Sequence, residues 1–112
     1  MNWSRIRDKR KEKGYTLAQV AAETGYSVGY LSQLERNQKE PSLAALRKIA
    51  NCLGCSEVWL IMQGQLEVHI GTHVYNALEG DCLYIPKNTL HNYLNTGLED
   101  AQCIVFFSDL IY

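Results

Sequence analysis

The spacing of apolar residues changes near residue 56, and this change constrains the fold of the 112-residue chain more than any other feature. Before it, apolar residues recur every three or four positions, as on the buried face of an α-helix. After it, short runs rich in β-branched and aromatic residues alternate with turn residues, as in antiparallel strands. We therefore predict an α+β chain with a helical part, residues 1–55, and a β part, residues 56–112.

Four helices are predicted in the helical part, because residues that favour helix caps precede each apolar repeat and turn residues follow it. Thr16 and Gln19 have the spacing of a capping box, which opens the second helix. The expected starts are Ser4, Thr16, Ser27 and Ser42, and the expected ends are Lys13, Gly25, Asn37 and Gly54.

Six short strands are predicted in the β part, and together they indicate a small antiparallel sandwich or barrel. The expected strands are residues 58–62, 66–70, 74–78, 82–85, 90–94 and 102–107. Segment 56–62 leaves an alternative open, because Ser56 can cap a fifth helix there. Its β-branched and aromatic content favours a strand.

Charge is divided unevenly between the two parts. Residues 1–55 contain ten Lys and Arg against five Asp and Glu, a net charge of +5, whereas residues 56–112 have a net charge of −6. We therefore expect the basic part to contact a polyanion. No apolar run reaches the ~20 residues of a membrane span, and residues 1–14 lack the apolar segment of a secretory signal. A cytoplasmic protein without a membrane partner is expected, and its length excludes a large substrate-enclosing enzyme.

Four cysteines, Cys52, Cys55, Cys82 and Cys103, are expected to be reduced thiols in that compartment. Cys52 and Cys55 have CxxC spacing, but the second pair of ligands that a zinc site needs is absent from the sequence. We interpret them as small buried apolar residues and expect no metal or cofactor there.

The helical part carries a specific set of residues at fixed spacing. Gly25 separates two short helices, residues 31–36 read LSQLER, and Leu53-Gly54 ends the fourth helix. With Arg10, Lys13-Gly14, Val20-Ala21 and Pro41-Ser42-Leu43, this pattern over residues 6–55 resembles the phage-repressor-like helix-turn-helix regulators, the Xre family. The resemblance implies sequence-specific binding to double-stranded DNA, with the third helix in the major groove. It also implies a structural ion pair between Arg10 and Glu35.

Two groups of DNA-contacting residues follow from this resemblance. Base edges are expected to be contacted by Ser27, Val28, Gly29, Tyr30, Ser32 and Gln33. The phosphate backbone is expected to be contacted by Tyr30 and by Thr16, Leu17, Arg36, Asn37 and Lys39. Leu17 departs from the family pattern, which often has a polar residue at that position. The base-contacting set is poor in bidentate side chains, so we expect modest direct readout.

The β part resembles the cupin family in two motifs. Residues 57–64, EVWLIMQG, match the end of the first motif, and residues 80–95, GDCLYIPKNTLHNYLN, match the second, with Asn88 in place of the usual Gly. Full cupins have further strands before Glu57 that carry a His-x-His, whereas residues 51 and 53 here belong to the fourth helix. Only Glu57 and His91 remain of the usual metal ligands, so we expect neither a metal site nor metal-dependent catalysis.

A β part without its first strands is expected to expose a sheet edge and an apolar face. We predict that a second copy of the chain covers this face, with or without exchange of strands. The expected dimer core contains Trp59, Ile61, Tyr84, Ile85, Ile104, Phe106 and Phe107.

Together these features predict a homodimeric transcriptional regulator, expected to be a repressor that binds a pseudo-palindromic operator. Three alternatives remain open at this point. The β part is a sensor for a small molecule or metal, the chain is a cupin-type metalloenzyme, or the chain is an antitoxin-like protein that binds another protein. The identity of any effector is not specified by the sequence.

Overall fold

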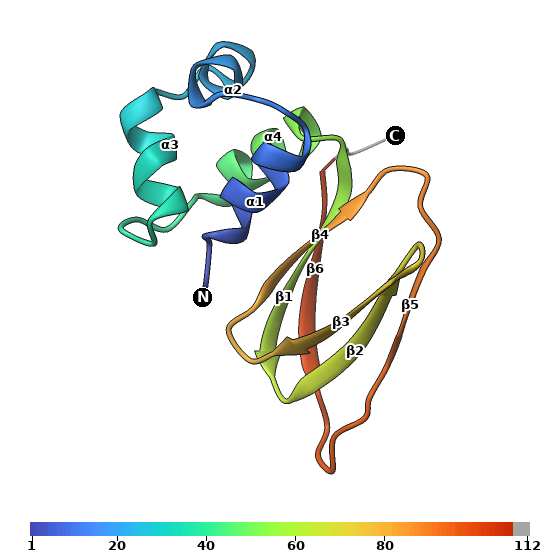
Figure 1. Cartoon of the computed structure of the whole chain (residues 1–112). Helices are drawn as coiled ribbons and strands as arrows, with labels where there is room; N and C mark the ends of the chain where they lie inside the picture. The colour runs from blue at the N-terminus through green and yellow to red at the C-terminus, as the bar shows by residue number, and fades with distance from the viewer. Residues whose placement is uncertain (109–112) are drawn as a thin grey trace.

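A computed structural model describes residues 1–108 and contains four helices followed by six strands (Figure 1). The helices are α1 (Arg5–Glu12), α2 (Leu17–Thr24), α3 (Val28–Glu35) and α4 (Leu43–Cys52). The strands are β1 (Cys55–Gln63), β2 (Gln65–Ile70), β3 (His73–Leu78), β4 (Cys82–Pro86), β5 (His91–Leu94) and β6 (Gln102–Phe107). The predicted α+β class is confirmed. Within the described residues, no helix has the length and apolar character required to cross a membrane.

The starts of α2, α3 and α4 follow the capping signals in the sequence. The Thr16 hydroxyl accepts a hydrogen bond from the Gln19 amide at 3.1 Å, and the Gln19 side chain accepts one from the Thr16 amide at 2.8 Å. This is the predicted capping box. Ser27 and Ser42 cap α3 and α4 in the same way, each with its hydroxyl accepting from an amide three residues later.

Helix α1 differs from the prediction at both ends. Ser4 precedes it with helical backbone angles, φ −63° and ψ −17°, and its side chain makes no cap hydrogen bond. A capping residue needs an extended backbone to bring its oxygen over the first amides. The Ser4 hydroxyl instead donates to the Asn2 side chain at 2.6 Å. The helix ends at Glu12, one residue before the expected Lys13.

The six strands form two three-stranded antiparallel sheets, with orders β4-β1-β6 and β3-β2-β5. Strand β1 is central in the first sheet, and its successive side chains point to opposite faces. Val58 and Leu60 join the core formed with the helices, whereas Trp59 and Ile61 join the core between the two sheets. This alternation has a period of two, so the alternative of a fifth helix over residues 56–62 is wrong.

The helical part packs directly on the sheet β4-β1-β6. Helix α4 contacts β1 and helix α1 contacts β4, while α3 lies on the side of the helical part that faces away from the strands (Figure 1). Only two residues separate α4 from β1. Cys55, the last residue of the predicted helical part, begins β1 and is fully buried in the shared core. The two parts therefore share one apolar interface.

Candidate nucleic-acid interface

Helices α2 and α3 form a helix-turn-helix unit with Gly25 in the turn. Gly25 has a φ of +82°, a left-handed conformation that residues with a Cβ rarely adopt, and its amide donates to the Ala21 carbonyl at 2.9 Å. Leu31 and Leu34 bury one face of α3 in the helical core. The opposite face of α3 is therefore free to meet a partner.

This free face contains most of the residues predicted to contact bases. Val28, Gly29 and Gln33 are exposed, as is Ser27 at the start of the helix, whereas Tyr30 and Ser32 are partly buried. The Ser27 hydroxyl accepts from the Tyr30 amide at 3.0 Å, which leaves its own proton available to donate. Val28 is 45% exposed, so its methyl groups are accessible to a thymine methyl group.

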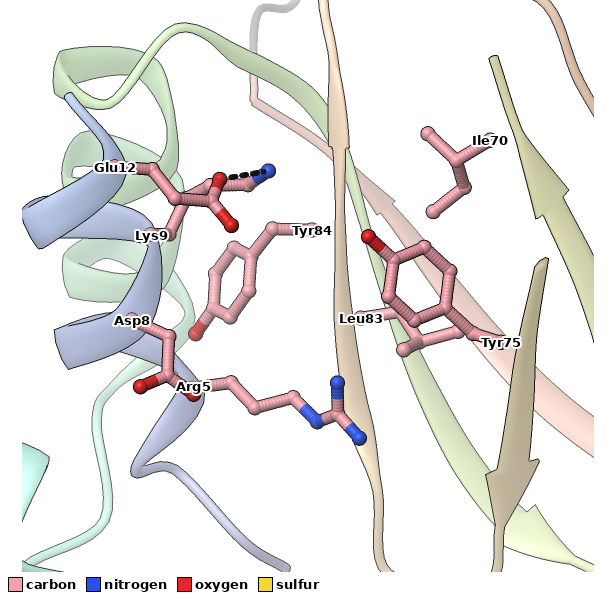
Figure 2. Close-up of a pocket in the computed structure, with 8 residues that line it drawn as sticks. All are labelled: Arg5, Asp8, Lys9, Glu12, Ile70, Tyr75, Leu83 and Tyr84. Atoms are coloured by element: carbon pink, nitrogen blue, oxygen red, sulfur yellow. Dashed lines mark hydrogen bonds and ion pairs between the residues drawn. The ribbon is translucent and has the colours of Figure 1, made fainter. Parts of the chain in front are cut away.

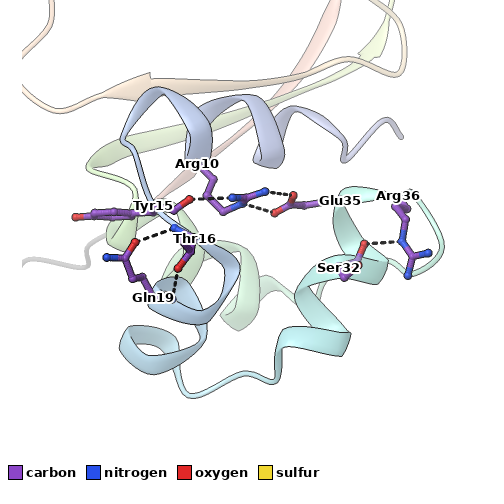
Figure 3. A network of polar contacts seen from close by, with 7 residues as sticks. All are labelled: Arg10, Tyr15, Thr16, Gln19, Ser32, Glu35 and Arg36. Atoms are coloured by element: carbon purple, nitrogen blue, oxygen red, sulfur yellow. Dashed lines mark hydrogen bonds and ion pairs between the residues drawn. The ribbon is translucent and has the colours of Figure 1, made fainter.

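Arg10 ties α3 to α1 and to the loop before α2 (Figure 3). Its Nε and Nη2 donate to the two carboxylate oxygens of Glu35 at 2.8 and 3.0 Å, and its Nη1 donates to the Tyr15 carbonyl at 2.8 Å. The two paired side chains are only 12% and 5% exposed. Hydrogen bonding to Glu35 raises the pKa of Arg10, although burial opposes it. This pair fixes the position of α3 and does not face its exposed surface.

Three residues predicted to contact phosphates have polar groups that are still available. Thr16 accepts a hydrogen bond in the capping box and keeps its hydroxyl proton to donate. Arg36 donates from Nε to the Ser32 carbonyl at 3.3 Å (Figure 3), and its terminal amino groups have no partner among the described residues. Lys39 is exposed, with its ammonium 5.7 Å from the centroid of the Tyr30 ring.

The side chains of two other residues of the predicted phosphate-contacting group make contacts within the protein. The Asn37 side chain accepts from the Trp3 amide at 2.6 Å and donates to the Asn2 side chain at 2.9 Å. Its φ of +57° fits the predicted role as a helix terminator. Leu17 packs against the helical core. Asn37 therefore anchors the N-terminal segment, a long-range contact that no local sequence signal could reveal.

A cluster of two tyrosines and two lysines beside the turn was not foreseen from the sequence. The rings of Tyr26 and Tyr30 lie 5.3 Å apart between centroids. The Lys48 ammonium, from α4, lies 5.6 Å from the Tyr26 ring, and Lys39 approaches Tyr30 as described above. The four-residue spacing of the tyrosines was a visible signal. The lysines come from separate segments, and their approach depends on the tertiary fold.

The seven residues predicted to form a dimer core lie in three environments. Between the sheets, three are buried: Trp59, Ile61 and Ile85. Against the helices, Tyr84 is buried and Phe106 is partly buried. Only Ile104 and Phe107 are substantially exposed, at 44% and 55%. The expectation that a second chain buries the other five is corrected, because the helices and the opposite sheet already cover them.

Exposed apolar side chains remain along β5 and β6, each of which is the edge strand of its sheet. Tyr93 and Leu94 on β5 are 60% and 57% exposed, and Val105 on β6 is 38% exposed. Trp59, Tyr93 and Val105 also line a cavity of about 290 Å³ on this side of the two sheets. This edge therefore keeps several apolar side chains exposed in a single chain.

The two residues that remain of the cupin metal-ligand set are paired with each other. Nε2 of His91 on β5 lies 2.8 Å from a carboxylate oxygen of Glu57 on β1, so the pair connects the two sheets. Within residues 1–108, no three His, Cys, Asp or Glu side chains gather in positions that could hold a metal ion. Two donors do not complete a transition-metal site. The residues present therefore do not fit a cupin-type metal centre.

The four cysteines are free thiols with low nucleophilicity. Burial raises the pKa of Cys52 and of Cys82 to about 12, and it also raises the pKa of Cys55 and Cys103. A hydrogen bond of 3.0 Å from the Cys52 thiol to the Glu23 carboxylate adds to the effect. Protonated thiols are poor nucleophiles and poor metal ligands.

Comparison with known proteins places both parts of the chain in families. A helix-turn-helix family model matches residues 6–60, and a cupin domain model matches residues 54–107. An uncharacterized HTH-type transcriptional regulator of Sinorhizobium fredii, y4dJ, is 42% identical over 60 residues, which cover 54% of this chain and 74% of the relative. The chain belongs to the Xre-type helix-turn-helix regulator family. Its cupin domain follows the helix-turn-helix domain directly.

Other proteins that match this helix-turn-helix regulator either cover a smaller share of its chain or have a lower sequence identity to it. SinR of Bacillus subtilis is 45% identical over 53 residues, 46% of this chain and 48% of SinR, so the chain spans about half of that relative. A helix-turn-helix family transcriptional regulator from Vibrio cholerae matches 93% of both chains at 17% identity and a TM-score of 0.44. The hydroxypropylphosphonic acid epoxidase of S. wedmorenis matches at 12% identity and the same TM-score, over 93% of this chain and 96% of its own. Likeness at this level carries no argument about function.

Proposed function

We propose that this chain is a cytoplasmic, homodimeric transcriptional repressor that binds a pseudo-palindromic operator through α3 of each subunit. The exposed face of α3 carries the proposal, because it is held in place by the Arg10–Glu35 pair and flanked by Arg36 and Lys39. A second helix of this kind enters the major groove with its first residues at the base edges. The charge of +5 on residues 1–55 supports contact with DNA.

The proposed contacts fall into two groups, those to base edges, which give sequence specificity, and those to phosphates, which position the protein on DNA. Val28 meets a thymine methyl group, Gln33 addresses adenine, and the hydroxyls of Ser27 and Ser32 reach other base edges. Gly29 allows close approach of the backbone. The remaining proposed contacts go to phosphates, from Thr16, Tyr30, Arg36 and Lys39. Asn37 and the Leu17 side chain are left out of this interface because both are used within the fold.

The proposed dimer joins two chains through the β5–β6 edge. Ile104, Phe107, Tyr93 and Leu94 are exposed there, and both edge strands have unpaired backbone groups. A second copy is the occupant that the proposal requires, because a pseudo-palindromic operator is read by two helices related by a two-fold axis. The relatives are named transcriptional regulators, which supports a role without catalysis or a cofactor.

Selection of DNA from a random pool by the full chain tests this function. We expect an inverted repeat whose half-sites are centred about one helical turn apart, ~34 Å. Sedimentation of the complex is expected to give two chains per operator. A selected site without symmetry, or one chain per site at saturation, would contradict the proposal.

A further inference from the structure

The loop that follows α3, residues 36–41, carries Arg36 and Lys39, the two cations proposed to contact phosphates. Among the described residues, the hydrogen bonds of this loop return to α3, with one exception. The exception is the Asn37 side chain, which binds residues 34 and 35 positions away in sequence. Asn37 therefore provides the hydrogen-bonded link between this loop and the rest of the protein.

The segment that Asn37 binds is itself attached to the β part. The Asn2 amide donates to the Gly80 carbonyl at 2.7 Å, in the turn between β3 and β4, residues 79–81. The Asn2 side-chain oxygen accepts from the Asn37 side chain at 2.9 Å, and the Asn37 side-chain oxygen accepts from the Trp3 amide at 2.6 Å. Figure 1 shows the N-terminus between the loop after α3 and this turn. Asn2 therefore connects the loop to the β part.

Two further contacts hold the same segment in place. Trp3 is 8% exposed and lies in the core that the helices share with β1. Arg5 begins α1 and lines a cavity of about 280 Å³ between α1 and strands β2, β3 and β4 (Figure 2). Its side chain extends from α1 toward the strands, and its Nη2 lies 3.9 Å from the Asp81 carboxylate. The segment is therefore held by both the helical core and the β3–β4 turn.

We infer that Asn2 and Asn37 are positioning residues for DNA binding. They hold the loop of Arg36 and Lys39 in the arrangement that contacts phosphates, and the β3–β4 turn is the attachment point. A loop loses backbone freedom when it binds, so a loop that is ordered in advance binds more tightly. The β part thus adds to the DNA affinity of each chain, apart from its role in pairing two chains. This inference rests on the proposed function.

Asn37→Gly is the direct test, because glycine tolerates the left-handed backbone of residue 37 and removes both side-chain hydrogen bonds. Asn88→Gly is the matched control, since Asn88 has the same φ of +57° and is exposed in the β part. We expect Asn37→Gly to bind the operator about tenfold more weakly than the control, because affinity falls with the fraction of chains whose loop has the binding arrangement. The salt slope is expected to match the parent's, because no cation is removed.

Asn2→Ala separates positioning from a direct contact of Asn37 with DNA. It removes the acceptor of the Asn37 side chain and is expected to weaken operator binding as much as Asn37→Gly. The double variant is expected to show no further loss, because both changes break one link. Asn76→Ala, at an exposed position of β3, is the control.

Asp81→Ala tests the attachment to the β part. The Asp81 carboxylate accepts from the Leu78 amide at 2.8 Å and so holds the turn that presents the Gly80 carbonyl. NMR relaxation of backbone amides in the free chain is expected to show greater mobility of the loop after α3 in this variant, as in the Asn2 and Asn37 variants. Asp100→Ala, at an exposed position between β5 and β6, is the control. Circular dichroism confirms that each variant is folded.

Three results would overturn the inference. The first is equal operator affinity for Asn37→Gly and Asn88→Gly when the parent chain binds. The second is weaker binding by Asn37→Gly without weaker binding by Asn2→Ala, which would assign Asn37 a direct contact with DNA. The third is loop mobility in any of the three variants equal to that in its control. A parent chain that binds no DNA would instead overturn the proposed function, and this inference with it.

Discussion

Arg10 on α1 and Glu35 at the end of α3 are joined at two points, Nε to Oε2 at 2.8 Å and Nη2 to Oε1 at 3.0 Å. A third donor of the same guanidinium binds the Tyr15 carbonyl. Because both side chains are mostly buried, the orientation of α3 on α1 depends on this pair. The Arg10–Glu35 pair, which lies on the buried side of α3, therefore determines the orientation of the exposed face that we propose contacts DNA.

Glu35→Gln tests this dependence. Removing the carboxylate leaves the buried Arg10 charge without its counterion, so we expect the free energy of unfolding to fall by about 3–5 kcal/mol. Urea unfolding followed by circular dichroism measures the loss. Glu40→Gln, at an exposed position, is the control and is expected to unfold like the parent. Equal stability of the two variants would show that the pair does not hold α3.

Val28→Ala tests direct readout. We expect it to lower affinity by about 1–3 kcal/mol at the matched base and to change the base preferred there. Ser32→Ala is expected to act at a different base pair. Val74→Ala, on an exposed position of β3, is the control with the same loss of methyl groups. Binding titrations on operators with single substitutions give the result, and an unchanged base preference for Val28→Ala would contradict it.

Arg36→Ala and Lys39→Ala test the phosphate contacts. Each is expected to weaken binding to specific and random DNA alike and to reduce the salt slope by about one unit. Affinities measured over a series of salt concentrations provide this slope. Arg7→Ala, also exposed but distant in sequence from α3, is the comparison. A loss confined to the specific operator would assign these cations to base contacts instead.

Ile104→Asp and Phe107→Asp test the proposed dimer. Both side chains are exposed in a single chain, so a charge there is expected to leave the fold intact and to shift the chain to a monomer. Sedimentation equilibrium with circular dichroism separates the two effects. Val74→Asp places the same charge on exposed β3 and is expected to remain a dimer. If all three variants remain dimers, the β5–β6 edge is not the dimer interface.

The cysteines provide a chemical test of the structure. Because burial and the Glu23 carboxylate raise the pKa of Cys52 to about 12, its thiol is protonated at pH 8 and is expected to react slowly with iodoacetamide. Glu23→Gln removes the carboxylate, lowers this pKa and is expected to speed alkylation of Cys52 alone. Mass spectrometry of the modified peptides identifies the site. Rapid alkylation of Cys52 in the parent protein would contradict the described environment.

The elements were predictable because their signals are local. The capping box at Thr16 and the left-handed residue at Asn37 act within a few residues of the chain. The assignment of the dimer core was less successful, because the five consecutive apolar residues 58–62 of β1 indicate that both faces of the strand are buried without showing what covers each face. Val58 and Leu60 turned out to face the helices, and Trp59 faces the other sheet.

In the candidate site too, features with local signals were predictable and features that depend on the tertiary fold were not. Positions on α3 followed from helical periodicity and from the family resemblance, and Arg10 was paired with Glu35 by that resemblance alone. The roles of Asn37 and Lys48 were not predictable, because their partners lie more than twenty positions away in sequence. The cavity between α1 and the strands exists only after the two parts pack together.

Strand β1 has one face in each apolar core, and this makes the two families of the chain a single thermodynamic unit. Val58 and Leu60 lie in the same core as Leu46 and Ile49 of α4, so a fragment that ends at residue 55 exposes that surface to water. We therefore expect the two parts to denature in one cooperative event, with core amides of both parts exchanging with solvent through the same global opening. A destabilising change between the sheets lowers the population of chains able to present α3.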